Sequence, residues 1–149
     1  MPEETSFIVK FFDKAYEDKS ILELVDAPVS AISGVSESDG EDLDKAFGIK
    51  SVLDFAGNKY VRLAQGITNF SDCSGDILDK EYELEQYVEL AEKPVEAISG
   101  VSDNDATLLK KAFNIKTIRD LAENKYVMIA QTTVTLAALI EMLIDAGMV

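Results

Sequence analysis

Apolar side chains recur along the chain at the three- and four-residue spacing that places them on one face of a helix. Leu43, Ala46 and Phe47 share such a face, and another apolar stripe begins at Tyr60. The same spacing returns 66 residues further along the chain. The pattern therefore predicts an all-α protein built from short helices.

Polar residues in front of these stripes have the spacing of helix N-caps. Ser36 precedes Asp39 by three residues, and Ser51 precedes Asp54 by the same distance, which is a weaker form of the capping box. Gly48 follows Phe47, where helices commonly end in a left-handed turn. The caps indicate one helix beginning near residue 37 and another near residue 52.

An internal repeat is the most informative feature of the sequence. Residues 28–65 align without a gap on residues 94–131, and 23 of the 38 positions are identical. Identity at this level within one chain points to duplication of a folded unit. We therefore predict two tandem helical domains over 1–67 and 80–149, the second with an extended C-terminal helix. A polar stretch over 68–79 is expected to be the linker.

Each copy is preceded by residues that are expected to form a leading helix. The apolar positions of the first leading helix are Phe7, Ile8, Phe11, Phe12 and Ala15, and those of the second are Tyr82, Tyr87, Val88 and Ala91. Each domain would then contain four or five short helices.

The start of each repeat resembles the helix-hairpin-helix motif, whose pattern is hydrophobic-x-Gly-hydrophobic-Gly-x-x-x-Ala. The first copy has ISGVS at 32–36 followed by Gly40, and the second has ISGVS at 98–102 followed by Ala106. The resemblance implies two tandem helix-hairpin-helix-like (SAM-like) domains. In DNA-binding members of that family, the hairpin's backbone amides hold a phosphate.

The hairpin sequences differ from the family pattern at the positions on which phosphate binding depends. Ser36 replaces the second glycine, and the acids Glu37 and Asp39 follow it. The second copy has Ser102 followed by two further acids. Carboxylates beside a phosphodiester repel it, so we expect these hairpins to be structural corners and nucleic acid to be an improbable partner.

Composition and charge exclude several function classes. The 149 residues contain 14 basic and 28 acidic side chains, no His, no Trp and one Cys. A formal net charge of −14 disfavours anionic nucleic acid or an anionic membrane as the main partner. Histidine-based catalysis and intrachain disulfides are impossible. With a lone Cys73, the cytoplasm is the expected compartment.

The acidic side chains do not follow a recognisable metal or catalytic pattern. The run from Glu37 to Asp44 lacks the ligand order of an EF-hand, and the expected helix would spread its carboxylates apart. Cys73 lies between acids, and the chain contains no His that could activate its thiol. No phosphate loop, nucleophile elbow or cofactor fingerprint is present. We expect no catalytic residues, no metal site and no cofactor.

Two lysine–tyrosine pairs and a C-terminal apolar segment are the candidate binding elements. Lys59 with Tyr60, and Lys125 with Tyr126, recur at equivalent positions before the last helix of each copy. They are candidate partner-binding residues, with core packing of the tyrosines as the alternative.

From Val134 onward the second copy continues into an apolar segment that the first copy lacks, and this segment includes Leu139 and Leu143. It is apolar on most sides, which indicates a helix buried on most sides. Two arrangements remain open: docking onto the first domain, against Phe7, Phe11 and Phe12, or an interface with a partner or a second copy.

The sequence favours a non-catalytic, acidic protein-interaction or scaffold module, acting through a protein partner or self-association and not through a membrane. The alternative is a nucleic-acid-associated accessory protein, supported by the motif resemblance alone. A further alternative is an enzyme that uses carboxylates or a cofactor supplied by a partner.

Overall fold

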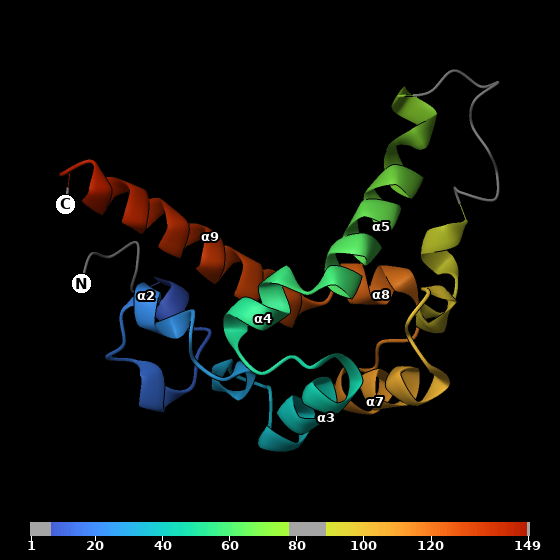
Figure 1. The fold of residues 1–149 in the computed structure, drawn as a ribbon, viewed down its shortest axis with the longest axis horizontal. Coiled ribbons are helices and arrows are strands. Elements are labelled where there is room, and N and C mark those ends of the chain that lie inside the picture. Colours follow the sequence, from blue (N-terminus) through green and yellow to red (C-terminus); the bar gives the residue numbers. More distant parts are fainter. Residues whose placement is uncertain (1–6, 78–88, 149) are drawn as a thin grey trace.

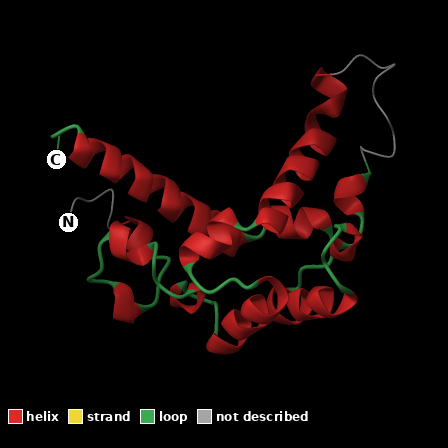
Figure 2. Cartoon of the chain, in the orientation of Figure 1, coloured by secondary structure: helices red, strands yellow, loops and turns green. Residues whose placement is uncertain are grey.

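The computed structural model describes residues 7–77 and 89–148, and these parts of the chain consist of helices joined by loops, with no strand (Figure 2). The all-α prediction is confirmed for them. The α-helices are α2 (Ile21–Leu24), α3 (Glu37–Phe47), α4 (Val52–Gly57), α5 (Lys59–Ile77), α7 (Asp103–Phe113), α8 (Ile118–Ala122) and α9 (Lys125–Asp145). The 3₁₀ helices are η1 (Lys14–Tyr16), η2 (Val29–Ala31), η4 (Leu90–Glu92) and η5 (Val95–Ala97).

The predicted caps form in both copies of the repeat. The Ser36 side chain accepts a hydrogen bond from the Asp39 amide at 3.0 Å, and the Asp39 carboxylate accepts one from the Ser36 amide at 3.1 Å. The same reciprocal pair begins α4, α7 and α8. Helices α3 and α7 both end in the left-handed conformation, at Gly48 with φ 69° and at Asn114 with φ 58°.

The leading segment of the first copy differs from the single helix that was expected. Residues 7–9 are helical, a turn follows, and 3₁₀ helix η1 forms separately. The amide of Asp13 donates to the carbonyl of Ala31 at 2.7 Å, and the amide of Ser33 donates to that of Phe11 at 2.8 Å. These bonds attach the segment in extended form, so Ile8 and Phe12 are buried whereas Ala15 is exposed. Of the second leading helix, Tyr82, Tyr87 and Val88 lie outside the described residues.

The two halves of the chain exchange their last helices. Helix α5 of the first half packs against α8 and η4 of the second, and α9 of the second half packs against α4 and α2 of the first. Helices α3 and α7 lie side by side (Figure 1). The buried apolar residues of both halves form one continuous core.

A reciprocal pair of glutamines marks the crossing of α5 and α9. The Gln65 side-chain amide donates to the Gln131 side-chain oxygen at 2.7 Å, and the reverse bond measures 2.9 Å. Gln131 also donates to the carbonyl of Ala56 at 3.1 Å, in the opposite half. Gln65 and Gln131 are equivalent positions of the repeat, so they lie on an approximate two-fold axis that relates the halves.

Two tyrosines cross between the halves and cover glycine turns. The Tyr126 hydroxyl donates to the carbonyl of Gly34 at 3.4 Å, and the Tyr60 hydroxyl donates to that of Gly100 at 3.4 Å. Both glycines have positive φ, 94° and 97°. A Cβ placed at Gly34 would lie 2.6 Å from the Tyr126 hydroxyl oxygen, and one at Gly100 would lie 2.5 Å from that of Tyr60. The turns therefore need glycine for conformation and for space.

The linker predicted over 68–79 is wrong as far as residue 77, because helix α5 continues through it to Ile77. Thr68 and Ser71 are only 3% and 8% exposed, since α5 packs there against η4. Their short polar side chains allow close packing while giving the stretch a loop-like composition. The buried apolar residues described within the expected domain ranges 1–67 and 80–149 belong to one core.

One acid is buried between the halves. The side chain of Asp42 on α3 is 4% exposed, and its Oδ1 lies 3.6 Å from the Nζ of Lys111, whose side chain is 65% exposed. The Oδ2 atom of Asp42 has no hydrogen-bond partner. The equivalent position of the second copy is Leu108.

Alanine at Gly34 or Gly100 is expected to lower the free energy of unfolding by about 1–3 kcal/mol, because a side chain at positive φ is strained and meets the tyrosine. Gly66→Ala is the matched control: its Cβ would meet nothing within 4 Å in helix α5. This control should be neutral or stabilise by up to about 1 kcal/mol. Urea unfolding monitored by circular dichroism measures all three, and equal effects at the three sites would contradict the packing described.

Asp42→Leu is expected to stabilise the protein by about 1 kcal/mol or more, because a buried carboxylate with an unpaired oxygen is replaced by the apolar residue of the other copy. Lys111→Met should instead destabilise, since it leaves the carboxylate buried without its cation. Thermal unfolding of both variants measures the contribution of the Asp42–Lys111 ion pair to stability. Destabilisation by Asp42→Leu would show that the acid stabilises the interface.

Candidate functional site

Helix α9 is buried on one face and exposes apolar side chains on the other. The inner face, which packs against the first half, consists of Val127, Ala130, Thr133 and Ala137. On the outer face, Met128 is 57% exposed, Leu139 is 49% exposed and Met142 is 67% exposed. Helix α9 docks onto the first half, but its last buried residue is Ala137. The prediction that the segment from Val134 onward is buried on most sides is therefore wrong.

The outer face has the spacing of a coiled-coil seam. Met128, Thr132, Thr135, Leu139 and Met142 follow one another at intervals of four, three, four and three residues. This 3.5-residue period keeps side chains along one line of a helix and is typical of helices that pair with another helix. We call these five residues the α9 seam. None of them is buried.

A groove runs beside the N-terminal half of the α9 seam. It consists of three adjoining hollows of about 420, 160 and 310 Å³, which all include Met128. Phe7 and Phe11 of the leading segment form one wall, and Ile129, Thr132 and Leu136 continue along α9. We call this surface the α9 groove, and its lining is mainly apolar.

Two lysines lie at one end of the α9 groove. Lys10 and Lys125 line the hollow that also contains Phe11, Ser33 and Tyr126. The Nζ of Lys125 is 5.0 Å from the centre of the Tyr126 ring, which is a cation–π distance. The groove therefore combines an apolar floor with a cationic end, and this arrangement suits an apolar helix that carries an acidic end.

By length and hydropathy, the segment Ile118–Asp145 also contains a window that is apolar enough to cross a membrane, and 22% of that window is buried in the protein. A core helix of a soluble protein passes the same test. The inner face of α9 packs against α4 and α2, so spanning a bilayer would require the helix to leave this core.

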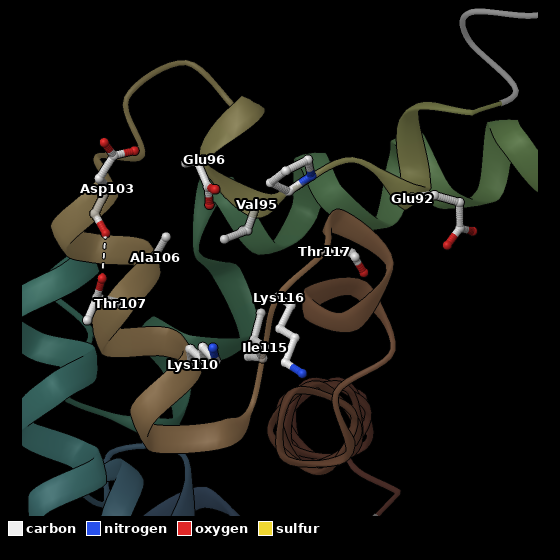
Figure 3. Close-up of a pocket in the computed structure, with 11 residues that line it drawn as sticks. Glu92, Val95, Glu96, Asp103, Ala106, Thr107, Lys110, Ile115, Lys116 and Thr117 are labelled. Atoms are coloured by element: carbon white, nitrogen blue, oxygen red, sulfur yellow. Dashed lines mark hydrogen bonds between the residues drawn. The ribbon is translucent and has the colours of Figure 1, made fainter.

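A second hollow, of about 450 Å³, lies between η5 and α7 (Figure 3). Its floor is Val95 and Ile115, and Lys110 and Lys116 project beside Ile115. Its hydroxyl groups have structural partners. The Thr107 hydroxyl donates to the Asp103 carbonyl at 2.9 Å, and the Thr117 hydroxyl caps α8 by accepting from the Asp120 amide at 3.0 Å. The carboxylates of Glu92, Glu96 and Asp103 also line the hollow, which holds acids and lysines together, whereas both of its hydroxyl groups bond the backbone.

A cluster of charges holds the far part of α5 against the second half. Arg119 bonds Asp72 of α5 at 2.8 Å, Glu92 of η4 at 2.6 Å and Glu123 at 3.1 Å. The hydrogen bonds from Arg119 hold the pKa of Asp72 below its ordinary value, and those to Asp72, Glu92 and Glu123 raise the pKa of the guanidinium. Because every cationic donor here already has a carboxylate, the cluster is a structural clamp.

The residues proposed from sequence fall into two groups. Tyr60 and Tyr126 contact the opposite half, as described above, and each has its neighbouring lysine, Lys59 or Lys125, at 5.0 Å from its ring centre. The tyrosines are therefore partly committed to packing within the chain, although Tyr126 and Lys125 also line the α9 groove.

Leu139 and Leu143 lie together near the end of α9. Leu139 belongs to the α9 seam, whereas Leu143 is half-buried beside it. Sequence reasoning missed Met128, Thr132 and Thr135, because the two threonines interrupt the apolar pattern. The alternation of four- and three-residue intervals along the helix is the signal that identifies them.

Among the described residues, no three His, Cys, Asp or Glu side chains form a cluster that would hold a metal ion. Comparison with protein-family models, with curated proteins and with solved structures finds no match to the chain.

Proposed function

We propose that the protein is a non-catalytic helical interaction module that binds an apolar helix of a protein partner along the α9 seam and groove. The observation that carries this proposal is the exposure of Met128, Leu139 and Met142 at coiled-coil spacing beside a groove walled by phenylalanines. Apolar helix faces that remain exposed on a folded protein are typical of protein interaction sites.

Two observations support a non-catalytic function: the composition of the chain and the hydrogen bonds made by the hydroxyl groups of the η5–α7 hollow. The chain contains no His. The hydroxyl groups of the η5–α7 hollow bond backbone groups or cap a helix. The cytoplasm remains the proposed compartment.

We propose further that the two copies are diverged helix-hairpin-helix-like units from an internal duplication. The identity of 23 positions in 38 supports this origin, as do the equivalent caps and the shared positive φ of Gly34 and Gly100. Nucleic-acid binding is the less supported function. In each copy a tyrosine from the other half covers the glycine turn, and acids such as Glu37 and Asp39 follow it.

A photo-crosslinking amino acid in place of Thr132 tests the binding surface in living cells. We expect a discrete adduct whose cross-linked peptide, identified by mass spectrometry, belongs to an apolar helix of a protein. Thr132 lies on the groove and is exposed, so the probe does not disturb the core. Leu139→Asp in the same chain should reduce the adduct severalfold, because a charge would have to enter an apolar contact.

Glu41 on α3, which is exposed and distant in the sequence from α9, is the matched control position for the crosslinker. Adducts at Thr132 that resemble those at Glu41, or that contain lipid only, would contradict the proposed function.

A further inference from the structure

We infer that the helix that occupies the α9 groove is α9 of a second copy of this chain, in an antiparallel pair centred on Thr135. This inference rests on the proposed function and names its partner. The arrangement is a two-fold homodimer, in which each copy contributes the same surface to the interface.

The two ends of the α9 seam are equidistant from Thr135. Met128 and Met142 lie seven residues on either side of it, and Thr132 and Leu139 lie three and four residues away. An antiparallel pair centred here places Met128 of one copy opposite Met142 of the other. The seam spans 14 residues, or about 21 Å of helix, so both ends engage in the same register.

The charges of α9 favour this antiparallel register. Lys125 and Asp145 each lie ten residues from Thr135, so the pairing sets the lysine of one copy beside the aspartate of the other. A parallel pair would instead align Asp145 with Asp145 and Glu141 with Glu141 and would place the helix dipoles side by side in the same direction. Lys10 adds a second cation at the end of the groove that receives the acidic helix end.

The N-terminal and C-terminal parts of α9 complement each other in shape. The N-terminal half lies beside the groove with Phe7 and Phe11, whereas the C-terminal part extends to the edge of the molecule beyond Ala137, the last buried residue of the helix (Figure 1). Leu139 and Met142 on that extension supply side chains that fit the groove of the second copy. Each copy thus offers one groove and one apolar helix end, and the two-fold pair buries both grooves and both helix ends.

Self-association on this surface also suits the charge of the chain. At a net charge of −14, two copies repel each other over most of their surface. Helix α9 carries only Lys125, Glu141 and Asp145, and no charged residue lies between positions 125 and 141. It is therefore the surface on which a second acidic chain meets the least repulsion.

Cysteine cross-linking of the full chain tests both the dimer and its register, in a Cys73→Ser background. Thr135→Cys lies at the centre of the pair and should form a disulfide dimer of twice 16.3 kDa on mild oxidation. Met142→Cys should remain monomeric, because its two copies would be about 21 Å apart and a disulfide needs Cα atoms within about 7 Å. A mixture of Met128→Cys and Met142→Cys chains should cross-link to each other.

Sedimentation equilibrium of charge variants tests the register without cysteines. Lys125→Glu and Asp145→Lys should each raise the dimer dissociation constant about fivefold, and the double exchange should restore it, since an exposed ion pair is replaced by like charges and then rebuilt. Glu41→Lys on α3 is the control for Asp145→Lys, because both substitutions raise the net charge by two.

A wild-type chain that stays monomeric at every concentration, with no cross-link at Thr135→Cys, would overturn the inference. Self-cross-linking of Met142→Cys as readily as Thr135→Cys would show a parallel pair and overturn it as well. If the chain is monomeric but the crosslinker at Thr132 still captures a helix of another protein, the dimer fails and the proposed function stands. If neither occurs, both fail.

Discussion

The structure depends on the exchange of the last helix between two similar halves. Only Asn58 separates α4 from α5, and one residue is too short a connection for α5 to fold back beside α4. Helix α5 therefore continues onto α8 of the other half, and α9 completes the exchange by packing on α4. The paired amides of Gln65 and Gln131 satisfy each other at the crossing, where an unpaired polar group would be costly.

The exchange leaves an outer face exposed on both last helices, with Leu63 and Phe70 exposed on α5 and the seam exposed on α9. Both exchanged helices use one face for the opposite half, but their outer faces differ in sequence. Where α9 has Met128, Thr132 and Thr135, α5 has Arg62, Gly66 and Asn69. Helix α5 is further held by the Arg119 clamp, whose position in the first copy is Leu53. At these equivalent positions α9 therefore has a coiled-coil seam that α5 lacks.

Local features of this fold were predictable from sequence because they depend on residues close together in the chain. The caps at Ser36 and Ser51 and the helix end at Gly48 formed as expected. The linker was mispredicted because Thr68 and Ser71 are polar by composition yet pack on η4. A long-range contact of that kind leaves little trace in the hydrophobic pattern.

The exchange itself was not predictable, for a physical reason. With 23 of 38 positions identical, the surface of one half is nearly the same as that of the other, so the last helix of each copy fits either partner. Leu139 was predicted as a partner-binding residue because it is apolar, whereas Thr132 and Thr135 required the spacing along α9 to be considered. The tyrosines were placed correctly at the helix starts, but their contacts with the opposite half follow from the exchange.

Nuclear Overhauser spectroscopy of the wild-type protein tests the exchange most directly. The Tyr126 ring carbon Cε1 lies 3.2 Å from the position that a Cβ would occupy at Gly34, and that of Tyr60 lies 3.3 Å from the position at Gly100. We expect cross-peaks from the Tyr126 ring to the Gly34 Hα protons and from the Tyr60 ring to those of Gly100. Cross-peaks that join Tyr60 to Gly34 and Tyr126 to Gly100 would show two self-contained halves and would contradict the exchanged arrangement.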